Sequence, residues 1–252
     1  MHTVAAMIPI GDEDEPGDLP YINLAIIAVN VLVFILLQLP SDAFTMGFSV
    51  IPKEITHGVD LVGPVAVQLP DGTTDTIVEA PGPSPIWLTL LTSMFMHGGW
   101  AHIGGNMLFL FVFGDNVERA LGHVKYLLFY LVCGVVAAYA QILSGPESVI
   151  PSLGASGAIS GALAAYLVYF PQNRVRVLVG LRFVTQVPAL MMIGLWILLQ
   201  LVSGIGSIAV SEQTGGVAYW AHIGGFIAGV VLAFLLRPFI RPRAPSAPSF
   251  AR

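Results

Sequence analysis

The chain has 252 residues, of which 56% are hydrophobic and only 10% are charged. Soluble domains carry about 25% charged residues, so this composition excludes an ordinary soluble domain and indicates a chain that lies mostly in lipid. The net charge of -5 and the lack of a basic stripe argue against a nucleic-acid partner. The single cysteine, Cys133, excludes an internal disulfide and a cysteine-based zinc cluster.

Six apolar segments alternate with polar connections along the chain. Residues 1–20 are polar and acidic, and they are predicted to be a short tail without a core. Residues 21–237 are expected to form one domain with membrane spans at 22–39, about 101–118, 126–143, 156–170, 187–203 and 217–236. Residues 238–252 are rich in Pro, Ser and Arg and are predicted to be a disordered tail.

The first connection, residues 40–86, is long. Alternating residues on both sides of Pro70-Asp71-Gly72 predict a β-hairpin within it. The uncharged stretch that follows, 86–114, is too long for one upright helix and is interrupted by glycines around His97. Residues 86–96 are therefore predicted to be an interfacial or partly inserted segment.

The fourth predicted span is short. At 1.5 Å per residue its length is roughly 22 Å, less than the ~30 Å of a hydrocarbon core. The loop before it is expected to dip into the membrane, where irregular backbone is tolerated only against protein or a watery cavity. This places Ser156, the first residue of the helix, at the floor of a cavity below the membrane surface.

The distribution of Lys and Arg predicts the orientation in the membrane. With six spans, every basic residue except Lys53 falls on one side. By the positive-inside rule both tails are then cytoplasmic, and the helix that begins at Ser156 starts from the outer side. His102 and His222 lie near the outer ends of the second and sixth spans, so these two residues and Ser156 are expected in one leaflet.

The stretch Gly154-Ala155-Ser156-Gly157 leads into the fourth helix. Serine is a favoured helix cap. A serine at this point is also well placed as a nucleophile, because unpaired backbone N–H groups and the positive end of the helix dipole face it. The stretch alone leaves both interpretations open.

Histidine is the candidate base for this serine. Ionisable residues inside spans are functional hypotheses by default, and a serine needs an adjacent base to act as a nucleophile. Small residues on one face of a helix let two helices approach closely, which would bring His222 within reach of Ser156 as a base or as a satisfied interhelical hydrogen bond. The small residues beside the two candidates are Gly157, Gly161, Gly225 and Gly229.

Acyl transfer also needs donors for a developing oxyanion. His102 and Asn106 are four residues apart and share one face of the second helix. With the backbone N–H of Ser156 they are candidate oxyanion donors. The alternative is two core polar residues that bond to a neighbouring helix.

Acidic and metal-binding patterns are missing from the middle of the predicted spans. The absence of Asp and Glu there argues against an aspartyl protease and removes the usual third member of a serine triad. No His-Glu-x-x-His sequence is present, so a zincin-type metal site is not expected. The predicted chemistry is a Ser156–His222 dyad without a metal or cofactor.

Three motifs together resemble those of the rhomboid family of intramembrane serine proteases. They are His97-x4-His102-x3-Asn106, Gly154-Ala155-Ser156-Gly157 and Ala221-His222-x2-Gly225-x3-Gly229. Weaker similarity extends over about residues 8–236. The resemblance implies an all-α membrane protein. Its fold would be a six-helix bundle with a short fourth helix, a re-entrant loop before that helix and a water-filled site that opens outward.

The resemblance also implies roles for individual residues. Ser156 would be the nucleophile, His222 the general base and acid, and His102, Asn106 and the Ser156 N–H the oxyanion hole. Substrates would be membrane proteins that are cut in or near a transmembrane segment, usually after a small residue, through an acyl-enzyme. The glycines expected to support helix packing are Gly154, Gly157, Gly161, Gly225 and Gly229.

The chain also departs from the family pattern. Ser160 stands where some members have an aromatic residue that stacks on the histidine, so His222 must be held otherwise. The first loop carries an extra hairpin. His97 matches the pattern, and a structural hydrogen bond is the expected role for its side chain.

Other functions remain open at this point. A non-catalytic rhomboid-like protein would bind transmembrane helices without cleaving them, and a small transporter would be expected to show inverted repeats. A six-span core without an added span suggests a prokaryotic plasma membrane. The sequence leaves the substrate and the oligomeric state undetermined.

Overall fold

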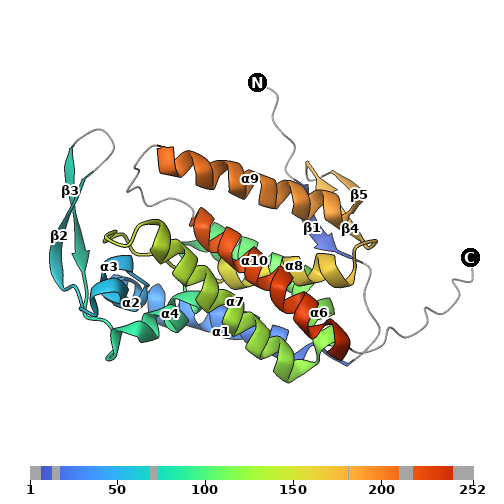
Figure 1. Cartoon of the computed structure of the whole chain (residues 1–252), viewed down its shortest axis with the longest axis horizontal. Coiled ribbons are helices and arrows are strands. Elements are labelled where there is room, and N and C mark those ends of the chain that lie inside the picture. Colours follow the sequence, from blue (N-terminus) through green and yellow to red (C-terminus); the bar gives the residue numbers. More distant parts are fainter. Residues whose placement is uncertain (1–6, 13–17, 69–72, 181, 210–217, 241–252) are drawn as a thin grey trace, which may run out of the picture.

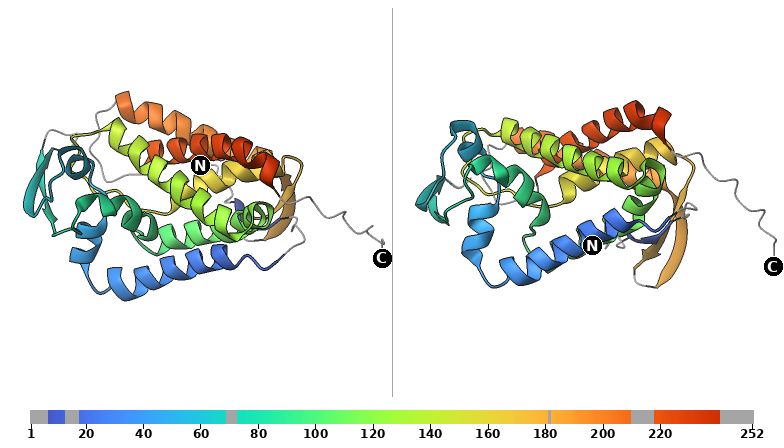
Figure 2. Two further views of the ribbon diagram at one scale, coloured as in Figure 1. Left: turned by 60° about the horizontal axis from the view of Figure 1, so that its bottom comes forward. Right: turned by 90° about the horizontal axis from the view of Figure 1, so that it is seen from below.

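A computed structural model describes residues 7–12, 18–68, 73–180, 182–209 and 218–240. Most of it is helical, with a small β-sheet at one end of the helix bundle and a β-hairpin at the other (Figure 1). Figure 2 shows α1 (Tyr21–Val33) on the opposite side of the bundle from α9 (Ala189–Ala209). The molecule is mostly helical, as expected, and the expectation of an all-α protein is corrected only where segments outside the bundle form strands.

The long helices follow the predicted apolar segments. A π-helical turn, Phe34–Gln38, continues α1, and a second one, Leu110–Gly114, joins the two helices of the second predicted span. The bounds of the other long helices are α5 Trp100–Phe109, α6 Asp115–Leu121, α7 His123–Ser144, α8 Ser156–Tyr169 and α10 Tyr219–Leu236.

Three helical stretches of the described chain are long and apolar enough to cross a membrane. They are Tyr21–Gln38, His123–Ser144 and Tyr219–Phe239, and shorter apolar stretches are Ile86–Phe95, Ser156–Tyr169 and Ala189–Ile205. Large apolar side chains on the outside of the bundle, such as Leu36, Leu128 and Leu143, are more than half exposed. Lipid tails are as apolar as these side chains, so the surface suits a bilayer.

Helix α8 occupies the centre of the bundle. Its residues from Gly157 to Tyr166 are all buried, and both α7 and α10 pack along it. Its 14 residues span about 21 Å. The irregular segment 145–155 leads into it and is tied to the first loop by backbone hydrogen bonds of 3.0 and 2.8 Å between Val50 and Ser152.

The N-terminal segment differs from its prediction. Strand β1 (Met7–Gly11) pairs antiparallel with β4 (Arg174–Val179), which pairs in turn with β5 (Phe183–Pro188). The expectation of a tail without a core is wrong for this strand. The partner strand supplies the core, because Val175 and Val177 of β4 are fully buried. The composition of the first 20 residues alone cannot predict this distant partner.

The first connection is largely structured. It contains α2 (Asp42–Phe48), α3 (Pro52–His57) and the predicted hairpin, whose strands β2 (Gly63–Gln68) and β3 (Thr74–Glu79) pair antiparallel. The hairpin is thereby confirmed, while its turn residues lie outside the described part of the chain, as does 241–252 of the predicted C-terminal tail. The predicted interfacial segment consists of three short helical pieces, Ile86–Leu88, α4 (Thr89–Thr92) and Ser93–Phe95.

Two acidic side chains are buried in this first connection. Glu54 accepts a hydrogen bond from the Leu61 N–H at 2.8 Å, and both carboxyl oxygens of Glu79 are buried without a hydrogen-bond partner among the described residues. Burial raises the pKa of each carboxyl to about 7. Repulsion from Asp60 also raises the pKa of Glu54, and repulsion from Glu54 also raises that of Glu79.

Charged side chains anchor the end of the bundle that carries the sheet. Glu118 of α6 is fully buried and accepts hydrogen bonds from the backbone N–H groups of Ile22 and Asn23 at 2.9 and 2.6 Å. Its carboxylate also pairs with Nδ1 of His123 at 2.5 Å. One acidic residue therefore satisfies unpaired donors at the start of α1 and ties α1, α6 and α7 together.

Candidate active site

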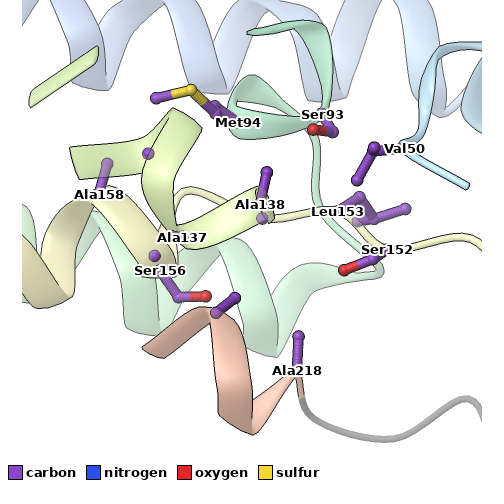
Figure 3. Close-up of a pocket in the computed structure, with 14 residues that line it drawn as sticks. Val50, Ser93, Met94, Ala137, Ala138, Ser152, Leu153, Ser156, Ala158 and Ala218 are labelled. Atoms are coloured by element: carbon purple, nitrogen blue, oxygen red, sulfur yellow. The ribbon is translucent and has the colours of Figure 1, made fainter. Parts of the chain in front are cut away.

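Ser156 is the first residue of α8, but its side chain does not cap the helix. The residue at the N-cap position is Ala155, and no side chain caps this helix. The Ser156 Oγ atom instead lies 2.7 Å from Nε2 of His222 on α10. Figure 3 shows the Ser156 hydroxyl directed toward the α10 ribbon. The structure thus removes the interpretation of Ser156 as a helix cap and brings the serine and the histidine together.

Glycines allow α8 and α10 to approach until their backbones touch. A Cβ atom on Gly225 would lie 2.0 Å from the carbonyl oxygen of Gly157, and one on Gly229 would lie 2.4 Å from that of Gly161. No side chain fits at such distances. This close crossing is what carries His222 to Ser156.

Another face of α8 packs tightly on side chains of α7. A Cβ atom on Gly157 would lie 2.5 Å from Cβ of Ala137, and one on Gly161 would lie 2.5 Å from Sγ of Cys133. The thiol of Cys133 is buried. Small residues on both faces therefore hold α8 between α7 and α10.

Gly154 positions the loop that enters α8. Its backbone N–H donates a 2.9 Å hydrogen bond to the carbonyl oxygen of Ser93, and its φ of +139° favours glycine. A Cβ atom at this position would lie 3.1 Å from Cε1 and Nε2 of His102. Gly154 thus lets the His102 ring approach the loop beside Ser156.

His102 and Asn106 both have donors available on α5. The Gly98 N–H donates to Nδ1 of His102 at 3.2 Å, so Nε2, which faces Gly154, carries the proton. The amide nitrogen of Asn106 is buried and has no hydrogen-bond partner among the described residues. A buried donor without a partner costs about 1–3 kcal/mol and could bond to an oxygen that is present only during a reaction.

His97 does not make the hydrogen bond expected of its side chain. Its ring is buried, and neither ring nitrogen has a partner among the described residues. The ring instead packs edge-on against His102, with centroids 5.1 Å apart. The side chain of Gln38 bonds to the backbone N–H and carbonyl of His97 at 2.8 and 3.1 Å, so the position is fixed through the main chain.

Two residues of α9 complete the surroundings of His222, and sequence reasoning missed both. Nδ1 of His222 lies 2.8 Å from Oε1 of Gln200, and the Trp196 ring lies 5.4 Å from the imidazole ring. Ser160 donates to the carbonyl oxygen of Ser156 within α8 at 2.6 Å. The available signal was Gln200 itself, the polar residue within the apolar run 195–202 of α9.

A small cavity of about 30 Å³ opens beside Ser156 (Figure 3), room for one or two water molecules. Its walls are made mostly of small side chains, and its lining includes Ser93, Gly134, Ala137, Ala138, Ser152, Gly154, Ser156, Gly157, Ala158, Ala218 and Ala221. Within the described part of the chain, no three His, Cys, Asp or Glu side chains gather where they could hold a metal ion.

Comparison with known proteins gives a consistent family. Residues 85–239 match the rhomboid domain family. The chain is 35% identical over 150 residues to rhomboid protease GluP of Bacillus subtilis, which covers 60% of this chain and 26% of that protein. It is 30% identical over 167 residues to rhomboid protease AarA of Providencia stuartii, covering 60% of this chain and 57% of that protein.

The chain is also similar to a plant protein. Rhomboid-like protein 11, chloroplastic, of Arabidopsis thaliana is 31% identical over 162 residues, which cover 62% of this chain and 54% of that protein. The chain thus spans between a quarter and about half of the length of these curated relatives. The matched family domain contains Ser156, His222 and the two candidate oxyanion residues His102 and Asn106. It also covers more than half of the chain, which therefore belongs to the rhomboid family of membrane proteins.

Proposed function

We propose that this chain is an intramembrane serine endopeptidase that cleaves transmembrane segments of membrane proteins through an acyl-enzyme. The observation that carries the proposal is the 2.7 Å contact between Ser156 Oγ and His222 Nε2. A nucleophilic serine with its base within hydrogen-bond reach is the arrangement that acyl transfer requires. The protease names of GluP and AarA support the same reaction class.

The proposed reaction begins with the serine hydroxyl. His222 Nε2 accepts the proton as Ser156 Oγ attacks the scissile carbonyl carbon, and the imidazolium then gives that proton to the leaving amine. The acyl group remains on Ser156 until water, activated by the same imidazole, attacks it. The product carboxylate leaves, and the serine recovers its proton.

The proposed oxyanion hole uses donors from two helices. Nε2 of His102, the amide of Asn106 and the backbone N–H of Ser156 would donate to the developing negative charge. The tautomer of His102 and the unpaired amide nitrogen of Asn106 support this assignment. Preorganised donors stabilise the transition state because they need no reorientation as charge develops.

The proposed membrane arrangement has six spans with both tails in the cytoplasm. The shorter apolar helices α8 and α9, together with the α5–α6 stretch, would complete the set begun by the three long ones. The 145–155 segment would be the re-entrant loop, and the site would open to the outer side of a plasma membrane. The division at 1–20, 21–237 and 238–252 belongs to the same proposal.

The substrates we propose are single transmembrane segments with a small residue at the cleavage point. The cavity beside Ser156 supports this size, because alanines and glycines line most of it. Helix-breaking residues near the cleavage point would expose the scissile backbone to Ser156, since a helical peptide bond is covered by its own turn.

Cleavage in lipid tests the proposal. The protein is reconstituted in proteoliposomes with a single-span reporter that carries a small residue in its transmembrane segment. We expect wild type and Ser160→Ala to cleave it, while Ser156→Ala does not; Ser160 is the matched control because it is a buried serine one turn away. Cleavage by Ser156→Ala would overturn the proposal. Cross-linking of the intact reporter to an inactive wild type would support the binding protein instead.

A further inference from the structure

Among the described residues, no carboxylate contacts His222 in the way that usually orients a catalytic histidine, and α9 supplies a neutral group at this position. The two nitrogens of the His222 ring face two different helices. Nε2 lies 2.7 Å from Ser156 Oγ on α8, and Nδ1 lies 2.8 Å from Gln200 Oε1 on α9. Ser156, His222 and Gln200 thus form a continuous chain of hydrogen-bonding groups.

The chemistry of the amide fixes the direction of this chain. An amide oxygen accepts hydrogen bonds and cannot donate them, so Nδ1 of His222 must carry the proton in the contact with Gln200. The partner of one ring nitrogen decides which nitrogen is protonated. Nε2 is therefore left with its lone pair toward the Ser156 hydroxyl, as a general base requires.

We propose that Gln200 is a positioning residue that holds His222 in the tautomer and orientation needed to activate Ser156. The role of Gln200 in activating Ser156 rests on the proposed function, whereas the tautomer of His222 is a property of the resting protein. The Trp196 ring, 5.4 Å from the imidazole and tilted by 41°, limits rotation of the histidine from the same helix. Helix α9 thereby holds His222 from a different side than the aromatic residue that some rhomboid family members carry at the position of Ser160.

A neutral orienting group suits this location. A carboxylate within an apolar helix would carry a large desolvation penalty, whereas an amide with its oxygen bonded is tolerated. The amide stabilises an imidazolium less than a carboxylate does, so replacement by Glu should strengthen the base. Among the described residues, the ionisable group that acts electrostatically on His222 is His102 from α5.

The first test reads the tautomer without any activity. The protein is labelled with ¹⁵N in its six histidines, and His222→Ala identifies the His222 signals. We expect wild type at neutral pH to show a protonated Nδ1 and an unprotonated Nε2, and Gln200→Leu to shift the ring toward the other tautomer. A wild-type His222 protonated at Nε2 would overturn the inference, whatever the protein cleaves or fails to cleave.

The second test follows the rate at which a fluorophosphonate probe modifies wild type, Gln200→Leu, Gln200→Glu and Leu199→Ala across pH. We expect Gln200→Leu to label about 10- to 100-fold more slowly, part of the 10²–10⁴ that general base catalysis contributes. Gln200→Glu should retain labelling and move the acid limb to higher pH by about one unit, because a carboxylate stabilises the imidazolium.

Leu199 is the matched control, since its side chain is on α9 and 54% exposed, and its variant should behave as wild type. An unchanged rate and pH profile in Gln200→Leu would overturn the positioning role. Wild type that shows the expected tautomer but takes no probe and cleaves no reporter would contradict the proposed function and leave the hydrogen-bond chain standing.

Discussion

The two ends of α8 use buried polar groups in different ways. At its first residue, Ser156 contacts a histidine, and the chain of hydrogen bonds contains no carboxylate and borders a cavity. Near its last turn, the Tyr166 hydroxyl donates to the carboxylate of Asp12, which also accepts from the amide of Asn116 at 2.7 Å. The first end is uncharged and next to space for a substrate, while the second is charged and packed.

The residues proposed for catalysis and the residues that anchor the helices therefore lie at different ends of the bundle. At the end of the bundle that carries the sheet, the buried carboxylate of Glu118 accepts from two backbone N–H groups and pairs with His123. The candidate active site instead contains an unpaired donor, because the amide nitrogen of Asn106 has no hydrogen-bond partner in the described part of the chain. Variants at the first end should therefore change activity more than stability, and variants at the anchoring end should do the reverse.

The largest expected effect is on activity at the first end. Replacing His222 by Ala removes the base, and cleavage of the reporter should fall by at least about a thousandfold. The thermal unfolding midpoint should change little, because the glycine contacts between α8 and α10 remain. A variant that unfolds at much lower temperature would mean that His222 acts mainly in packing.

The anchoring end should show the opposite pattern. Glu118→Ala leaves the N–H groups of Ile22 and Asn23 without their acceptor, and a loss of roughly 3 kcal/mol in unfolding free energy is expected from two orphaned donors. Cleavage per folded molecule should stay near that of wild type at low temperature. A stable but inactive Glu118→Ala variant would contradict the claim that residues at this end affect stability rather than activity.

Gly225→Ala should affect both properties, because at this point packing and site coincide. Its new Cβ would lie 2.0 Å from the carbonyl oxygen of Gly157, and overpacking of this kind costs about 1–3 kcal/mol. Separation of the helices also lengthens the Ser156–His222 contact, so we expect at least about a tenfold loss of cleavage. Gly194→Ala is the control, since nothing lies within 4 Å of its added Cβ.

The smallest effect concerns the pH dependence of the first loop. The carboxyls of Glu54 and Glu79 have pKa values of about 7, against 4.5 for ordinary glutamate. The folded loop therefore binds more protons between these pH values, and its stability should fall as pH rises from about 4.5 to about 7. Glu79→Gln should flatten this slope, as measured by hydrogen exchange in the β2–β3 hairpin.

The exposed Glu147 provides the control for that experiment. A hydrogen bond from His57 lowers its pKa, so Glu147→Gln removes a contribution of the opposite sign. An unchanged slope between pH 4.5 and 7 in Glu79→Gln would mean that the buried carboxyl of Glu79 does not contribute to the pH dependence of the loop.

Sequence patterns predicted the helices better than the segments between them. Long apolar runs have one stable form in lipid, because every backbone group must find a partner within the segment. The strand at Met7–Gly11 escaped prediction because its partner lies more than 160 residues away in the chain, at Arg174–Val179. Such pairing depends on the whole fold and leaves no local pattern.

The candidate site shows the same division. The small faces formed by glycines on α8 and α10 could be read from residue spacing, and the Ser156–His222 contact followed from them. Gln200 could not be assigned in this way, because a polar residue in a mostly apolar helix does not reveal which neighbour it faces. The sequence predicts a structural hydrogen bond for the ring of His97, but in the structure this ring packs against His102 instead.

The most direct test of the central claim identifies the atom that reacts. Wild type, Ser156→Ala and His222→Ala are treated with a fluorophosphonate probe in detergent, and the adduct is located by mass spectrometry. An activated Ser156 predicts one phosphonylated residue in wild type, Ser156, and none in the two variants. A fully folded wild type without an adduct, or an adduct at Ser156 that forms equally fast in His222→Ala, would contradict the dyad.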